Sequence, residues 1–163
     1  MLAMLVVFAL FLQSGAAPPP RCDSPAYRAF DFWIGEWTVA APDGKPVGSS
    51  RVERVLDGCV IMEHWSNLAG PYSGKSFNTY NPADGSWTQH WVDSTGASIL
   101  MTGRFEGRNL IYGREFVRRD GKAVKSRMTF FDQGKRSVRQ LVEQSADGGA
   151  TWTTQIDYTY TPR

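Results

Sequence analysis

Short runs of strand-favouring residues alternate with turn signals from about residue 36 to the end of this chain. The turn signals recur roughly every ten residues, for example "PDGKP" at 42–46, "NPADG" at 81–85 and "RDGK" at 119–122. Asp-Gly and Asn-Pro steps favour tight hairpins, because Gly adopts positive φ freely and Asn and Asp tolerate it. No long stretch shows a helical period. The pattern therefore predicts an antiparallel meander.

The runs between the turns are rich in Val, Ile, Thr, Tyr, Phe and Trp, which favour strands. We expect an all-β fold, a barrel or a sandwich. We favour an up-and-down barrel of about eight to ten strands, because closure removes exposed sheet edges. The predicted strands cover residues 36–41, 48–56, 60–68, 75–80, 86–92, 98–105, 109–118, 123–131, 137–145 and 151–161.

The segment "SPAYRAFDFWI" at 24–34 carries a helix signal. Ser24 is a favourable N-cap residue, and Pro25 suits the first helical position. A short helix here would cover one end of the barrel. It would place three aromatic side chains in the apolar mouth: Phe30, Phe32 and Trp33.

The first residues predict export. The run "LAMLVVFALFL" at 2–12 is apolar but too short for a membrane span, which needs ~20 residues. Small residues follow, a layout typical of a signal peptide cleaved after Ala16 or Ala17; the alternative is an uncleaved apolar anchor. We expect a periplasmic or secreted protein with no membrane span after cleavage. Its parts are a signal peptide (1–17), an N-terminal arm with a short helix (18–34) and a barrel domain (35–163).

Charge and cysteine content narrow the partners and cofactors. The formal net charge is +2 and no Lys/Arg block occurs, which argues against nucleic acid as a partner. In an exported protein, Cys22 and Cys59 are expected to form a disulfide, worth ~3–4 kcal/mol in the chain-entropy account. Two free thiols or half of a metal site are the alternatives. Two His and no CxxC pair occur, so we expect no metal and no cofactor.

Alternation along the central strands places aromatic and polar side chains on the same faces. Trp87, Gln89 and Trp91 share one face of their strand, for example. A cavity for a small molecule is mostly apolar and aromatic, with a few placed polar groups. We therefore predict that a small apolar or aromatic molecule binds inside the barrel. The predicted site consists of Glu63, Trp65, Asn78, Tyr80, Trp87, Gln89 and Trp91. The oligomeric state is left open.

Other interpretations of these residues stay open. Side chains fill the interiors of small barrels, so the core can be solid, or the faces can be inverted with Trp87 and Trp91 outside. Glu63 can act as an acid or base in catalysis, or it can belong to a buried ion pair. The partner in that pair would be Arg104, Arg127 or Arg139. No nucleophile-elbow, phosphate-loop, zinc-protease or dinucleotide motif occurs, so we favour binding over catalysis.

The step "GEW" at 35–37 reads G-x-W at the entry to the first predicted strand. It resembles the start of the calycin barrels, which include lipocalins, fatty-acid-binding proteins and nitrobindin-like proteins. The resemblance implies that Trp37 plugs the closed barrel end and that a late Arg stacks on it, either Arg163 or Arg139. Gly35 would let the chain turn into this strand without a side-chain clash.

Longer phrases resemble a family of secreted bacterial proteins of unknown function with an expected lipocalin-like barrel. They are "FDFWIGEWTV" at 30–39, "GKSFNTYNPADGSWTQHWVD" at 74–93 and "VRQLVEQSADGGATWTTQIDYTY" at 138–160. The resemblance implies a barrel and export, and it transfers no activity. Nitrobindin-like barrels bind haem through a late His, whereas this chain has no His after His90. Some calycin-like barrels are lyases or isomerases. An acid–base role for Glu63 in such a reaction would rest on analogy between folds.

Overall fold

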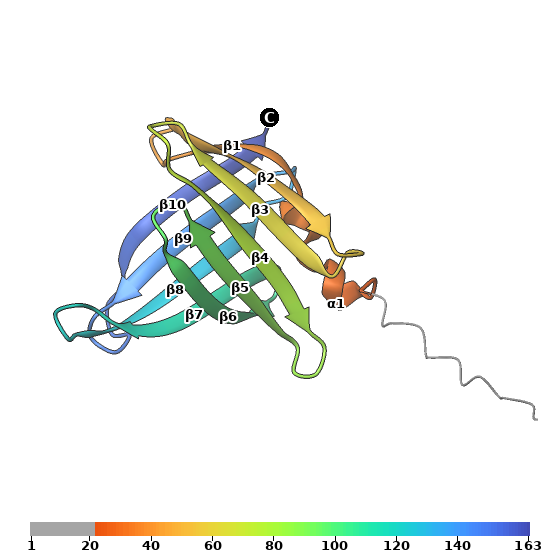
Figure 1. Cartoon of the computed structure of the whole chain (residues 1–163). Coiled ribbons are helices and arrows are strands. Elements are labelled where there is room, and N and C mark those ends of the chain that lie inside the picture. The colour runs from red at the N-terminus through yellow and green to blue at the C-terminus, as the bar shows by residue number, and fades with distance from the viewer. Residues whose placement is uncertain (1–21) are drawn as a thin grey trace, which may run out of the picture.

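The chain forms a closed barrel of ten antiparallel strands (Figure 1). The structure, a computed structural model, describes residues 22–163. Consecutive strands pair with each other, and β1 closes the barrel by pairing with both β2 and β10. The predicted up-and-down barrel is confirmed. The strands are β1 (Gly35–Ala40), β2 (Pro46–Val55), β3 (Val60–Asn67), β4 (Ser73–Asn81), β5 (Ser86–Asp93), β6 (Ser98–Glu106), β7 (Asn109–Val117), β8 (Ala123–Asp132), β9 (Val138–Ser145) and β10 (Thr153–Pro162).

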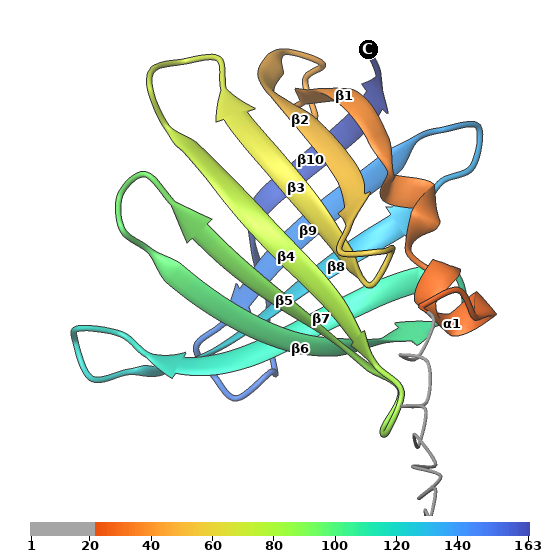
Figure 2. The same ribbon diagram turned by 45° about the vertical axis from the view of Figure 1, so that its right-hand side comes forward.

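All ten predicted strands are present, and their ends lie within two residues of the predicted ones. The expected turn residues connect them. Gly85 and Gly121 lie in hairpin turns with φ of 74° and 80°, values that side chains with a Cβ rarely allow. Figure 2 shows the β7–β8 turn reaching out from the barrel wall, on the side away from the N-terminal helix. The turn residues and the strand-favouring runs therefore explain where the strands begin and end along the chain.

Two short helices cover one end of the barrel (Figure 2). They are α1 (Pro25–Arg28) and the 3-10 helix η1 (Asp31–Trp33), both within the predicted segment. Ser24 occupies the N-cap position, but its side chain makes no capping hydrogen bond, so that part of the prediction is wrong. The four-residue helix is held instead by the buried aromatic residues that follow it.

These aromatic residues plug the covered end of the barrel. Phe30 and Trp33 are fully buried with ring centroids 5.0 Å apart, and Phe32 packs against the same core. Trp37 of β1 is 1% exposed, and its Nε1 donates a hydrogen bond to the carbonyl oxygen of Trp33 at 2.9 Å. A Cβ on Gly35 would lie 3.2 Å from the Trp37 ring, so glycine gives the indole its space there. Trp37 thus belongs to the plug.

Arg163 does not stack on Trp37, which corrects the expected contact. The Arg163 side chain is exposed, and its backbone N–H donates to the carbonyl oxygen of Glu36 at 3.0 Å. Trp37 pairs with Pro162 across β1 and β10, so the next residue, Arg163, points to the outer face. The ring of Tyr160 packs edge-on against Trp37 instead, with centroids 6.4 Å apart.

A disulfide joins Cys22 to Cys59, as predicted. It ties the N-terminal arm to the turn between β2 and β3. Arg54 reinforces this junction, because its guanidinium donates to the carbonyl oxygen of Gly58 at 2.9 Å and pairs with Asp31. The predicted signal peptide falls within residues 1–21, outside the described residues. Among residues 22–163, no helix is long and apolar enough to cross a membrane.

Candidate ligand-binding cavity

The barrel interior is packed at one end and hollow at the other. The aromatic plug fills the end covered by α1. At the opposite end lies a cavity of about 320 Å³, lined by inward-facing side chains of β3 and of β5 to β10. Trp87 and Trp91 both face the interior, which excludes the inverted arrangement. The barrel is therefore not filled along its whole length.

Two tryptophans of the cavity wall contact glycines of neighbouring strands closely. A Cβ on Gly48 of β2 would lie 2.6 Å from the Trp65 ring, and one on Gly74 of β4 would lie 2.2 Å from the Trp91 ring. Such distances exclude any larger residue unless the indoles move. The Tyr158 ring runs parallel to Trp65, with 3° between the planes and 5.9 Å between the centroids. The two glycines therefore give the indoles room beside the barrel wall.

Glu63 lies deep in the cavity and is 3% exposed. Its two carboxyl oxygens accept hydrogen bonds from Ser50 Oγ at 2.8 Å and from Ser76 Oγ at 3.2 Å. The Tyr160 hydroxyl lies 3.5 Å from Glu63 Oε1 and donates to Gln140 at 2.9 Å. Burial raises the pKa of Glu63 to about 7, and the hydrogen bonds offset only part of this increase. Glu63 therefore changes its charge near neutral pH.

An amide network beside Glu63 crosses the barrel between the cavity and the plug. Asn78 of β4 donates to Ser76 Oγ at 3.1 Å. Its Oδ1 accepts hydrogen bonds from Gln89 of β5 at 3.0 Å and from the Tyr112 hydroxyl of β7 at 3.1 Å. Asn78 and Tyr112 are fully buried, so these bonds satisfy polar groups that no solvent reaches. A satisfied network of this kind fixes the side chains that floor the cavity.

Glu63 has no basic partner among the described residues, so the ion pair considered from the sequence is wrong. The three arginines proposed for that role lie on the outer face, because the inward positions of their strands are taken by their sequence neighbours. Their partners are on that face too: Arg127 pairs with Glu143 at 2.7 Å, Arg139 pairs with Asp157 at 2.7 Å, and Arg104 donates to the carbonyl oxygen of Asp84.

The seven predicted site residues separate into two groups. Four of them line the cavity: Glu63, Trp65, Gln89 and Trp91. Two border a groove under α1 at the other barrel end: Tyr80 and Trp87. The seventh residue, Asn78, is buried between the groups. The pairing of β4 with β5 sets this order, because successive rows join Ser76 to Trp91, Asn78 to Gln89, and Tyr80 to Trp87.

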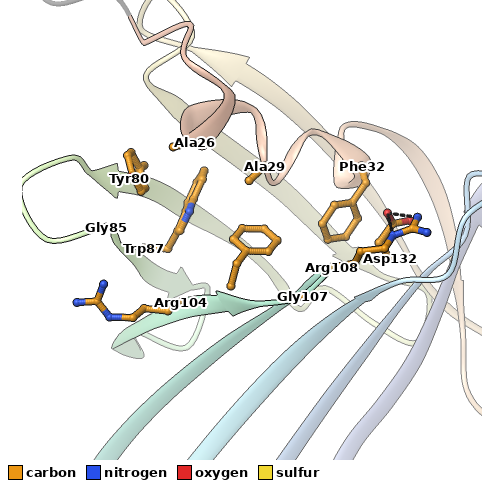
Figure 3. Close-up of a pocket in the computed structure, with 11 residues that line it drawn as sticks. Ala26, Ala29, Phe32, Tyr80, Gly85, Trp87, Arg104, Gly107, Arg108 and Asp132 are labelled. Atoms are coloured by element: carbon orange, nitrogen blue, oxygen red, sulfur yellow. Dashed lines mark hydrogen bonds and ion pairs between the residues drawn. The ribbon is translucent and has the colours of Figure 1, made fainter.

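The groove under α1 has a volume of about 500 Å³. Figure 3 shows Tyr80 and Trp87 at one side of it, with Phe32 at the other. Two positive groups border the groove, and both have partners. Arg108 pairs with Asp132 at 2.6 Å, and Arg104 is bound to a backbone carbonyl group. The described part of the groove therefore offers no cationic group free to bind a ligand.

Asp93, Arg114 and Tyr158 are among the cavity-lining residues that the sequence pattern did not single out. Alternation could have revealed Arg114, since it lies two residues after the inward-facing Tyr112. The guanidinium of Arg114 lies over the Phe116 ring, 4.4 Å from the centroid. Partial burial lowers the pKa of Arg114. The sequence predicts Arg104, Arg127 or Arg139 as an interior arginine, whereas among residues 22–163 the arginine that lines the cavity is Arg114.

The remaining candidates for metal or acid–base chemistry lie outside the barrel. His64 contacts Glu53 at 2.9 Å and His90 contacts Ser98 at 2.9 Å, both on the outer face. Within residues 22–163, no three or more His, Cys, Asp or Glu side chains gather closely enough to hold a metal ion. Comparisons with protein-family models and with curated proteins find no match for this chain.

Proposed function

We propose that this protein binds a small apolar or aromatic molecule in the cavity at the open end of the barrel. The observation that supports this most directly is the hollow of about 320 Å³, since ligand sites typically span about 300–1,000 Å³. Three aromatic rings form much of its wall: Trp65, Trp91 and Tyr158. Close contacts with glycines hold the wall residues in place, and hydrogen bonds hold the floor residues. Binding therefore costs little side-chain conformational entropy.

Export is part of the same proposal. The Cys22–Cys59 disulfide fits an oxidising compartment, and the apolar run at 2–12 fits a leader that directs the chain there. The ligand would then be held in the periplasm or outside the cell.

Catalysis in this cavity is the second candidate function. Glu63 faces the cavity with a pKa near 7, the range in which a carboxyl group is an effective acid or base. Tyr160 beside it adds a second proton-bearing group. Glu63→Gln separates the two functions, because a binding protein keeps most of its affinity, whereas an acid–base enzyme loses ~10²–10⁴ in rate.

Trp91→Ala is expected to weaken the binding of 2-naphthalenemethanol, a neutral aromatic probe, by about tenfold. The variant removes one ring contact and part of the wall, worth about 1.4 kcal/mol. Isothermal titration calorimetry measures the affinity. Trp152→Ala is the matched control, because that indole packs under Arg127 outside the cavity, and it should leave the affinity unchanged. Equal losses in the two variants, or no binding by the unaltered protein, would contradict the proposal.

A further inference from the structure

The charged side chains that line the cavity differ in how many hydrogen-bond and ion-pair partners they have within the protein. Among the described residues, one basic side chain, Arg114, and two acidic ones, Glu63 and Asp93, face it. Glu63 is deep, is bonded to hydroxyl groups and holds a proton below about pH 7. Asp93 and Arg114 are therefore the side chains that carry a charge in the cavity below about pH 7.

Asp93 has hydrogen-bond donors on both carboxylate oxygens. Its Oδ1 accepts from the backbone and the hydroxyl of Thr95, at 2.9 and 2.6 Å. Its Oδ2 accepts from the Tyr72 hydroxyl and from Trp91 Nε1, both at 3.0 Å. These hydrogen bonds hold the pKa of Asp93 well below its usual range. Asp93 thus fastens Trp91 and the β5–β6 turn at the rim, and its bonding capacity is used within the protein.

Arg114 is in the opposite condition. Its guanidinium lies over the Phe116 ring, 4.4 Å from the centroid, and Arg114 lines the cavity from β7. Among residues 22–163, the Arg114 guanidinium makes no hydrogen bond or ion pair with another side chain. Other arginines differ, because Arg108, Arg127 and Arg139 each pair with a carboxylate. A partly buried guanidinium without a carboxylate partner keeps N–H donors that can bind an anionic group.

Polar neighbours of Arg114 complete a place for an anionic group. Ser126 pairs directly with Arg114 across β7 and β8, and Gln144 pairs with Ser126 across β8 and β9. Both side chains line the cavity, and Gln144 Oε1 accepts a hydrogen bond from Arg118 at 2.9 Å, which leaves the amide N–H groups of Gln144 as donors. The hydroxyl and amide groups therefore lie on the same wall as the guanidinium, facing the aromatic wall made by Trp65 and Trp91.

We propose that the cavity binds the anion of an apolar or aromatic carboxylic acid, with Arg114 holding the carboxylate; this inference rests on the proposed function. A guanidinium offers two parallel N–H groups that match the two oxygens of a planar carboxylate. The cavity wall is mainly aromatic and apolar beyond Arg114, so the rest of the ligand is apolar. The small volume, and the one basic side chain that lines the cavity among residues 22–163, favour a ligand with one acidic group.

The test compares two probes of nearly the same shape, 2-naphthoate and 2-naphthalenemethanol, by calorimetry at low salt and at pH 6, where Glu63 is mostly protonated and 2-naphthoate is ionised. The unaltered protein is expected to bind 2-naphthoate at least about tenfold more tightly. In Arg114→Gln, the affinity for 2-naphthoate should fall about 10- to 100-fold, while that for the alcohol changes by less than about twofold. Arg119→Gln, at an exposed position in the β7–β8 turn, should change neither.

The outcomes separate this inference from the proposed function. If the alcohol binds and 2-naphthoate binds no better, the carboxylate inference fails and the proposed function stands. Equal losses in Arg114→Gln and Arg119→Gln would show diffuse surface charge and would also overturn it. If neither probe binds, both proposals fail. If Arg114→Gln does not fold, Arg114→Lys replaces it. Lysine keeps the positive charge but cannot offer two parallel N–H groups to a carboxylate. The affinity for 2-naphthoate should then fall, while the affinity for 2-naphthalenemethanol should not change.

Discussion

Trp37→Ala is expected to lower the free energy of unfolding by about 3–5 kcal/mol, the usual cost of truncating a fully buried Trp. The indole is 1% exposed, packs on Tyr160 and donates from Nε1 to the Trp33 carbonyl oxygen. The variant leaves a cavity and an unpaired carbonyl group where the N-terminal segment seals the barrel. A loss of about 3–5 kcal/mol is a large part of the ~5–15 kcal/mol by which a typical domain is stable. Urea unfolding followed by circular dichroism measures the change.

Trp152→Ala serves as the control for this variant as well. That indole lies in the β9–β10 turn and contacts Arg127, so its removal should cost far less than removal of Trp37. Binding adds a second criterion. Trp37 lies outside the cavity, so the folded fraction of Trp37→Ala should bind 2-naphthalenemethanol with nearly normal affinity. Unchanged unfolding together with lost binding would show that Trp37 belongs to the ligand site rather than to the plug.

The ionisation of Glu63 is expected to lower the free energy of unfolding by about 3 kcal/mol between pH 4.5 and about 7. The pKa is 4.5 for an ordinary Glu and about 7 in the folded protein. Within this window the folded protein keeps a proton that the unfolded chain has released, so a rise in pH favours unfolding. Below pH 4.5 both states are protonated, and above about pH 7 both are ionised, so this contribution is then constant.

Glu63→Gln isolates this effect. The amide is neutral at every pH, and the hydroxyl groups of Ser50 and Ser76 can turn to bond it. The variant should match the unaltered protein near pH 4 and exceed its stability by about 3 kcal/mol at pH 8. Urea unfolding at pH 4, 6 and 8 measures the difference. Glu143→Gln is the control, because that carboxyl group pairs with Arg127 outside the barrel. A difference for Glu63→Gln that stays constant with pH would contradict the expected ionisation.

The strands could be predicted because their causes are local. Alternation, strand-favouring composition and Asp-Gly turns act over a few residues. A sheet built from ten successive antiparallel strands has two exposed edges, and closing it into a barrel removes both. The Cys22–Cys59 pairing followed from their number and from the predicted export. The Ser24 cap failed even so, because burial of the next aromatic residues, rather than capping, holds so short a helix.

The candidate site was less accessible to sequence reasoning. Alternation identifies residues that share a face, and it correctly turned Trp65, Gln89 and Trp91 inward. It gives no position along the barrel axis, so Tyr80 and Trp87 were grouped with residues of the opposite end. That position follows from the register of β4 and β5 within the closed barrel.

The sequence by itself determined the elements, their order and the alternation of faces, since these depend on neighbours within a few residues. Tertiary structure decided where the interior is solid and where it is hollow, because closure brings side chains from distant strands together. Glu63 received its hydroxyl partners from β2, β4 and β10, at separations of 13 and 97 residues. The same pairing matched Arg127 with Glu143 outside, whereas Arg114 faced the cavity without a carboxylate partner among the described residues.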